Sequence, residues 1–398
     1  MSSTTTAEQS GSRNAPSASK PSWNPLKCSG TDLPKNLAIM VKTLAIAALV
    51  VNHVRILPDP WLPFIPFLDR FPPVLFQKTL QTLFLVSALA IVFNRRLRLF
   101  SLIIGSTMLV AVVSSKAYYG NNKTFCGLMF LLAGLYKPGT PNFFRWQLAI
   151  TYFGAGLNKL LDPDWQSGLF FENWAVNRLH QPLYMALNSR LPSLVLARFM
   201  CWTTIVTELA IVPCLLVRQL NTVAVFSNVV FQASLCLFEG TTFTLFFYSM
   251  TACSLALVKW PDQPSPVFYD PSRRLSHVAR RFFAWWDLDE TFHWIPLEST
   301  PRGRSPVYLF AGKTVYSGFR ALQMIFLLNP VTYFVLAAII ASLQSMPADV
   351  GAFLRRMIVG SSLVLLAPPL AWIVDRLFGP GTLSSHPLPG PVRERLSA

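Results

Sequence analysis

Eight apolar stretches follow one another in the first 260 residues, and they constrain the fold more than any other feature of the sequence. A helix needs about 20 mostly apolar residues to cross a bilayer. The stretches lie at residues 36–57, 74–93, 99–115, 124–136, 143–161, 195–217, 220–238 and 241–259. With 13% charged and 52% hydrophobic residues, the chain has too little polar surface to face water on all sides. The pattern therefore predicts an all-α polytopic membrane helix bundle over residues 36–260.

The basic residues indicate how this bundle is oriented. The net charge is +16, but the lysines and arginines flank the apolar stretches instead of forming one polar stripe, so nucleic acid is not an expected partner. With the N-terminus in the cytoplasm, residues 94–98, Arg218 and Lys259 lie inside, and the mixed-charge loops 58–73, 116–123 and 162–194 lie outside. The positive-inside rule favours this even number of spans. We expect an integral protein of the cell's inner or plasma membrane, with membrane lipids as partners.

Three further regions have a plain interpretation. Residues 1–35 are polar and rich in Ser and Thr, which predicts a disordered tail. Residues 346–398 are expected to form an apolar C-terminal helix followed by a loose tail. The stretches 331–344 and 357–378 are apolar, and each of them either spans the membrane or lies on it. The six cysteines form no C-x-x-C pair, so we expect buried single thiols and no metal site.

The character of the sequence changes at residues 261–345, where prolines and charges of both signs become frequent. Strand-like composition occurs at residues 267–269, 292–297, 307–310 and 313–316, and helical spacing of apolar residues at 272–286 and 318–328. Strand, helix, strand, hairpin and helix is the order of a small thioredoxin-like α/β domain. We expect such a domain on the cytoplasmic side.

The densest candidate chemistry lies in residues 152–168. Gly154, Ala155 and Gly156 are small enough to let another helix approach closely. Lys159 follows, roughly 20 Å along the same helix and near the outer side of the membrane core. It either snorkels to the surface or, when partly desolvated, acts as a base.

Two features outside this run are further candidates. Glu208 lies mid-span and needs a polar partner, either as a structural pair or as part of a site. The outer loop 162–194 is rich in Trp, Phe, Tyr and Leu, which suggests helices lying at the membrane interface.

The pattern Y-F-x-A-G-x-x-K-L…D-x-D-W-x-x-G at residues 152–168 resembles the signature of the HTTM family, which includes vitamin K-dependent gamma-carboxylase. The resemblance implies Lys159 as the catalytic base of a carboxylase- or epoxidase-like enzyme, with Asn158, Trp165 and Glu208 as substrate-binding residues. It also implies a small lipophilic substrate and a reduced quinone such as vitamin K hydroquinone as cofactor. Relative to the family pattern, this chain has one extra residue between the lysine and the tryptophan.

A second catalytic position is implied by N-N-K-T-F at residues 121–125, which resembles N-N-H-S-Y of the carboxylase. Lys123 stands here in place of the histidine. A lysine has no imidazole ring and a higher pKa, so this departure counts against carboxylation chemistry. The other interpretation of Lys123 is a plain loop charge.

Residues 267–271, 286–289, 296–299 and 312–322 resemble the DCC family, whose thioredoxin-like members are sometimes fused to HTTM regions. Their D-x-x-C-x-x-C motif supplies an attacking and a resolving thiol. Residues 270–276 read D-P-S-R-R-L-S, and the whole region lacks cysteine. Thiol–disulfide exchange by this domain is therefore excluded on chemistry.

Two functions remain open from the sequence. One is an enzyme resembling the carboxylase, which uses Lys159 as a base on a small lipophilic substrate from the outer leaflet. The other is a non-catalytic membrane scaffold or small-molecule binder, with the DCC-like domain as an interaction module. A transporter is disfavoured, because neither inverted repeats nor broken helices are visible.

Overall fold

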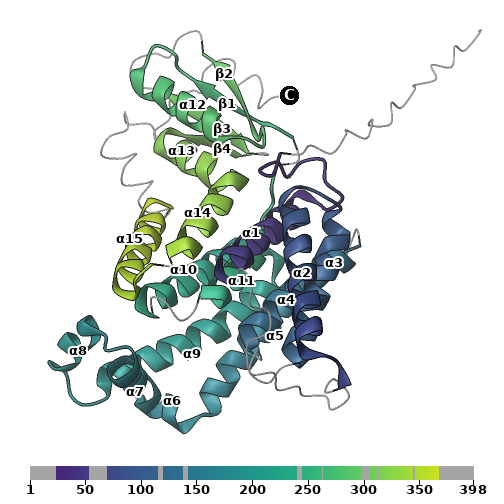
Figure 1. The fold of residues 1–398 in the computed structure, drawn as a ribbon. Coiled ribbons are helices and arrows are strands. Elements are labelled where there is room, and N and C mark those ends of the chain that lie inside the picture. The colour runs from purple at the N-terminus through teal and green to yellow at the C-terminus, as the bar shows by residue number, and fades with distance from the viewer. Residues whose placement is uncertain are drawn as a thin grey trace, which may run out of the picture.

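The computed structural model describes residues 24–52, 70–114, 120–137, 142–239, 244–261, 263–297, 305–311, 314–343 and 346–366. Every one of the eight apolar stretches contains a helix. These are α1 (Lys35–Asn52), α2 (Pro73–Val92), α3 (Leu97–Ser114), α4 (Asn121–Leu135), α5 (Asn142–Leu161), α9 (Val195–Leu216), α10 (Asn221–Glu239) and α11 (Thr244–Leu255). The helical bundle expected from hydropathy is formed, and a small sheet lies at one end of it (Figure 1).

Within the described residues, four helical segments are long and apolar enough to cross a membrane. They are α2, α3, α9, and α10 together with the preceding 3-10 turn η3 (Arg218–Leu220). Helices α13 (Gly318–Leu327) and α14 (Pro330–Ser342) pass the same test as a pair, with a bend of 67° between them. Pro330 begins α14, and Asn329 caps it by accepting a hydrogen bond from the Val331 backbone. Helix α15 (Ala348–Leu366) covers the described part of the last apolar stretch, which extends beyond the described residues.

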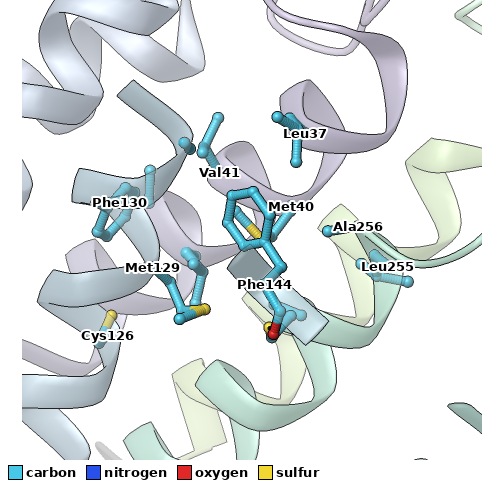
Figure 2. Close-up of a cluster of buried hydrophobic side chains, with 14 of the residues drawn as sticks. Leu37, Met40, Val41, Cys126, Met129, Phe130, Phe144, Leu255 and Ala256 are labelled. Atoms are coloured by element: carbon cyan, nitrogen blue, oxygen red, sulfur yellow. The ribbon is translucent and has the colours of Figure 1, made fainter. Parts of the chain in front are cut away.

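An apolar cluster occupies the centre of the bundle. Figure 2 shows Met40 and Val41 of α1 close to Met129 and Phe130 of α4, with Phe144 of α5 beside them. Lipid tails are as apolar as these side chains, so close packing holds such helices together within a bilayer. Glycine permits a close approach between α3 and α4, where a Cβ atom added to Gly105 would lie 2.6 Å from the Leu131 backbone nitrogen.

A buried polar network crosses the same bundle. The Tyr152 hydroxyl of α5 is hydrogen-bonded to Asn228 and accepts from Gln232, at 2.9 Å, both on α10. The Asn228 amide also donates to the Met250 carbonyl of α11 at 3.0 Å. Because unsatisfied polar groups are costly inside apolar surroundings, this network fixes how α5, α10 and α11 pack.

The sheet has four strands in the order β2-β1-β3-β4. They are β1 (Ser265–Tyr269), β2 (Phe292–Pro296), β3 (Val307–Ala311) and β4 (Thr314–Ser317). Strand β1 is parallel to β2 and antiparallel to β3, which forms a hairpin with β4. The parallel pair requires a crossover, and α12 (Arg274–Trp286) supplies it. All the strands and helices that the sequence predicts between residues 265 and 327 are formed.

Residues 24–34 correct the expectation of a disordered tail up to residue 35. Cys28 is buried, and its backbone N–H donates to Asp289 Oδ1 at 2.6 Å. Lys35 forms a 3.0 Å ion pair with the other oxygen of the same carboxylate. The polar composition of this segment predicts disorder. It cannot reveal a contact with a partner 261 residues away, and that contact orders the segment. Residues 1–23 lie outside the described residues.

Candidate functional site

Residues 162–194 fold into short helices at the end of the bundle opposite to the sheet, and this placement gives them the name outer segment (Figure 1). They are α6 (Pro163–Ser167), α7 (Leu169–Asn173), the π-helical turn η2 (Trp174–Arg178) and α8 (Pro182–Asn188). Asp162 caps α6 by accepting a hydrogen bond from the Asp164 backbone at 2.9 Å. Gly168 turns the chain between α6 and α7 with φ 89°, and a Cβ atom there would lie 2.7 Å from the Arg198 backbone nitrogen. Glycine is required at this position.

Lys159, in the last turn of α5, forms an ion pair with Glu208 of α9. Its Nζ atom lies 2.8 Å from Oε1 and 2.7 Å from Oε2 of the carboxylate. The ammonium also lies 5.1 Å from the ring centroid of Trp165, within cation–π range. The exposed fraction is 20% for the Lys159 side chain and 8% for the Glu208 side chain. Both charged side chains are thus largely buried within the protein, and each neutralises the charge of the other.

Gly156 brings the two helices together at this point. It lies one turn before Lys159, and a Cβ atom added to it would meet Leu209 Cδ2 at 2.8 Å. Gly154, by contrast, faces open space, because a Cβ atom added to it would have no neighbouring atom within 4 Å. Of the two glycines in the predicted small-residue run, Gly156 is therefore the one that makes the close approach.

A cavity of about 830 Å³ opens beside the ion pair. Six aromatic side chains form most of its apolar wall: Trp165, Phe170, Phe171, Trp174, Phe231 and Phe246. Polar side chains line the rest of it: Asn121, Asn122, Asn173, Asn177, Arg178 and Thr204. Trp165 and Phe170 stack on each other with ring centroids 4.3 Å apart. Such a wall accommodates a flat, mostly apolar molecule that has a polar end.

The predicted site residues fall into two groups. Lys159, Glu208 and Trp165 all line the cavity. Asn158 is exposed and is not among the described lining residues, because consecutive residues of a helix point about 100° apart. Lys123 is half-buried in the first turn of α4, and its neighbours Asn121 and Asn122 line the cavity although Lys123 itself does not.

Sequence reasoning missed two aspects of this site. It did not single out Arg178 or the amides of Asn173 and Asn177, although the length and aromatic content of the loop indicated some function there. It also named Lys159 and Glu208 without pairing them. The available signal was two opposite charges in separate apolar stretches, each of which needed a partner.

Not every charge of the outer segment belongs to the cavity. The Glu172 carboxylate is hydrogen-bonded to the Tyr184 hydroxyl and accepts from Asn188 Nδ2 at 3.1 Å. Burial and the adjacent Glu172 carboxylate raise the pKa of Tyr184 well above its usual value, so its hydroxyl stays protonated and donates. These contacts hold α7 against α8. Within the described part of the chain, no cluster of three or more His, Cys, Asp or Glu residues is arranged to hold a metal ion.

Comparison with known proteins identifies the same part of the chain. Residues 140–260 match the HTTM domain family. This range contains α5, the outer segment and α9 to α11, and therefore both members of the ion pair. Neither a curated protein nor a solved structure matches the chain.

Proposed function

We propose that this chain is a membrane protein related to the gamma-carboxylase-like proteins, and that Lys159 acts as a general base on a small lipophilic molecule in the cavity. The observation that carries the proposal is the Lys159–Glu208 pair, whose two members both line a cavity of about 830 Å³. Withdrawing two charges from water costs several kcal/mol per ion. Ionisable groups kept at such a cost beside a cavity are typical of functional sites.

The cavity wall supports a ligand with an aromatic or otherwise flat apolar body. Trp165, Phe170 and Phe231 offer ring faces and edges for stacking, while Asn177 and Arg178 offer hydrogen-bond donors for a polar end. The reduced quinone implied by the family resemblance fits this donor set and volume. When bound, it would supply an ionisable aromatic hydroxyl group.

Glu208 provides the route by which Lys159 becomes a base. An ammonium has no lone pair, so Nζ must first pass a proton to the carboxylate 2.7 Å away. The resulting neutral amine accepts a proton from the ligand, and the electron pair of the broken bond stays on the ligand. The new ammonium then lies beside the anion and stabilises it electrostatically. Trp165 and Phe170, stacked at the cavity wall, limit the access of water.

The test uses the full-length protein in phosphatidylcholine nanodiscs with a reduced naphthoquinone as the probe. Binding is measured by quenching of tryptophan fluorescence, and reaction by oxygen uptake. Lys159→Arg keeps the positive charge but removes proton abstraction, because a guanidinium does not deprotonate in proteins. We expect binding to persist in this variant and oxygen uptake to fall about 10²- to 10⁴-fold, the usual contribution of a general base. Undiminished uptake by the Lys159→Arg variant would exclude Lys159 as the base.

A non-catalytic binder is the second candidate function. It is favoured by the closed geometry of the ion pair, in which both carboxylate oxygens contact the ammonium. It is also favoured by Lys123, which occupies the second catalytic position of the resemblance but is not among the described lining residues. In this case addition of the quinone quenches the tryptophan fluorescence of the native protein, but no oxygen is consumed.

For the sheet we propose a thioredoxin-like domain of the DCC kind, with an interaction role. The support is the strand order β2-β1-β3-β4 with a helical crossover between parallel β1 and β2. In the loop after β1, the Ser272 hydroxyl donates to Asp270 Oδ1 at 2.6 Å. The Ser276 hydroxyl, in the first turn of α12, is hydrogen-bonded to the Asp270 and Arg273 carbonyls. Both hydroxyls are thus bound within the segment in which a DCC protein carries its cysteines.

A further inference from the structure

Helix α12 carries a stripe of exposed apolar side chains that the packing of the domain does not use. Val278, Phe282 and Trp285 are spaced by four and three residues and therefore share one face of the helix. Their exposed fractions are 57%, 47% and 69%. The helix already contributes another face to the domain, since Ser276 is buried and Phe283 packs against the core beneath the sheet. The fold accounts for that face but not for the exposed stripe.

Basic residues border the stripe. From Arg273 to Trp286 the chain has four arginines and one histidine, and it has no acidic residue. Two of the arginines are engaged locally. Arg273 pairs with Asp270 at 3.4 Å, and the Arg280 guanidinium lies 5.0 Å from the centroid of the Tyr269 ring.

The other basic side chains surround the apolar stripe. His277 and Arg281 line a shallow groove together with Val278, Phe282 and Trp285. Arg274 lies one turn from His277 and Val278 on the same side of the helix. Among the residues that the structure describes, none of these three basic side chains has an acidic partner in an ion pair.

The C-terminal end of α12 is fixed to the helical bundle. Trp286 Nε1 donates to Thr332 Oγ1 of α14 at 3.1 Å, and Asn329 Nδ2 donates to the Trp286 carbonyl at 3.3 Å. Helix α14 in turn packs into the bundle, where Phe334 joins the central apolar cluster. Figure 1 shows the sheet unit with α12 joined to the bundle through α13 and α14. The exposed stripe is therefore held on the same body as the helices that are apolar enough to cross a membrane.

We propose that this face of α12 binds the anionic headgroup layer of the membrane that holds the bundle. Trp285, Phe282 and Val278 enter the boundary between headgroups and acyl chains, and Arg274, His277 and Arg281 contact the lipid phosphates. A helix with aromatic residues on one face and arginines beside them is typical of the membrane interface. A stable protein partner is less well matched, because three side chains are few against the roughly 20–30 residues that each side of a standard protein interface contributes.

The test measures the depth of a spin label in the full-length chain. The label is attached to Val278→Cys in a Cys214→Ala background, because the other five cysteines are buried. Collisions with a water-soluble nickel chelate are compared in nanodiscs of phosphatidylcholine alone and of phosphatidylcholine mixed with phosphatidylglycerol. We expect the label to lose most of these collisions in the anionic discs and to gain collisions with oxygen, which partitions into lipid.

Two control variants sharpen the result. A label at His293→Cys, exposed on β2 of the same domain, should remain equally accessible to the chelate in both discs. Arg274→Gln together with Arg281→Gln should restore chelate access at position 278 in the anionic discs. An unchanged spectral line shape of a label at position 293 in the same double variant shows that the domain is still folded.

Two outcomes would overturn the proposal. In one, the label at position 278 is equally open to the chelate in both discs. In the other, it is shielded in detergent without lipid, increasingly so at higher protein concentration, which would show that the face joins two copies of the chain.

Discussion

At the scale of single residues, variants of Lys159 and Glu208 measure how much a buried ion pair contributes to the free energy of unfolding. Glu208→Leu leaves the Lys159 ammonium without its carboxylate in largely buried surroundings. We expect a loss of about 3 kcal/mol of unfolding free energy, at the low end of the usual range because part of the lysine is exposed. The double variant Lys159→Met/Glu208→Leu should recover most of this loss, since no charge is then left unpaired. Unfolding in detergent measures both, and equal destabilisation by the single and double variants would contradict the argument.

Cys28 gives a prediction about pH. Burial raises the pKa of its thiol to about 12. At pH 9 only about one such thiol in a thousand is a thiolate, whereas most of an ordinary thiol with a pKa near 8.5 is ionised. We therefore expect alkylation of Cys28 in the folded protein to remain slow from pH 7 to pH 9, and to accelerate over this range only after unfolding. Peptide mass spectrometry after timed alkylation measures the rate.

The sequence reveals a site residue when residues of that type are rare in the surrounding stretch of the chain. A lysine and a glutamate within apolar stretches are conspicuous, and both Lys159 and Glu208 line the cavity. Their contact joins positions 49 residues apart, and no periodic pattern encodes it. Asn177 and Arg178 are ordinary residues for a polar loop, so only the folded outer segment reveals that they reach the cavity.

At the scale of elements, hydropathy predicts where helices occur but not where they end. The stretch 241–259 contains α11, which ends at Leu255, and the chain then continues in turns. The end depends on local hydrogen bonds, such as the one that the Ala256 N–H donates to the Cys253 carbonyl, and side-chain polarity does not record them. In the sequence, the only sign of the 67° bend between α13 and α14 is Pro330, which stops one helix and starts another.

The close packing of α3 against α4 can be probed with glycine substitutions. A methyl group at Gly105 would collide with the α4 backbone, at 2.6 Å from Leu131 N and 2.8 Å from Gly127 O. Backbone atoms cannot yield as side-chain ends do, so Gly105→Ala should lower the thermal unfolding temperature by several degrees. Gly154→Ala is the matched control, because its methyl group would meet open space. If both variants unfold at the same temperature, close α3–α4 packing does not contribute to stability.

At the scale of the whole molecule, Asp289 joins the sheet unit to the start of the bundle. Its carboxylate accepts hydrogen bonds from the Cys28 and Ser29 backbone and pairs with Lys35. Asp289→Ala should release residues 24–34, which limited proteolysis would detect as new cleavage there. Glu290→Gln is the control, because Glu290 is largely exposed where it pairs with Lys27, and exposed pairs contribute little. Protection that persists in Asp289→Ala would show that other contacts hold this segment.

The opposite placement of the sheet and the outer segment also predicts a sidedness. With the N-terminus in the cytoplasm, cysteines introduced at Arg96 and His293 should react from the cytoplasmic side, and one introduced at Leu183 from the other side. All three positions are exposed, so each should react readily with a membrane-impermeant maleimide. Labelling of Arg96→Cys and Leu183→Cys from the same side would refute the proposed topology.

The ion pair also bears on the evolutionary history of the site. Because a lone charge at either position leaves its partner uncompensated, mutations that remove one of them are tolerated only with a second change at the other. Homologous chains should therefore either retain both the Lys159 ammonium and the Glu208 carboxylate or have lost both, so that the two alignment columns covary. Gly156 should vary with them, since a larger residue there would push apart the two helices that bring the charges together.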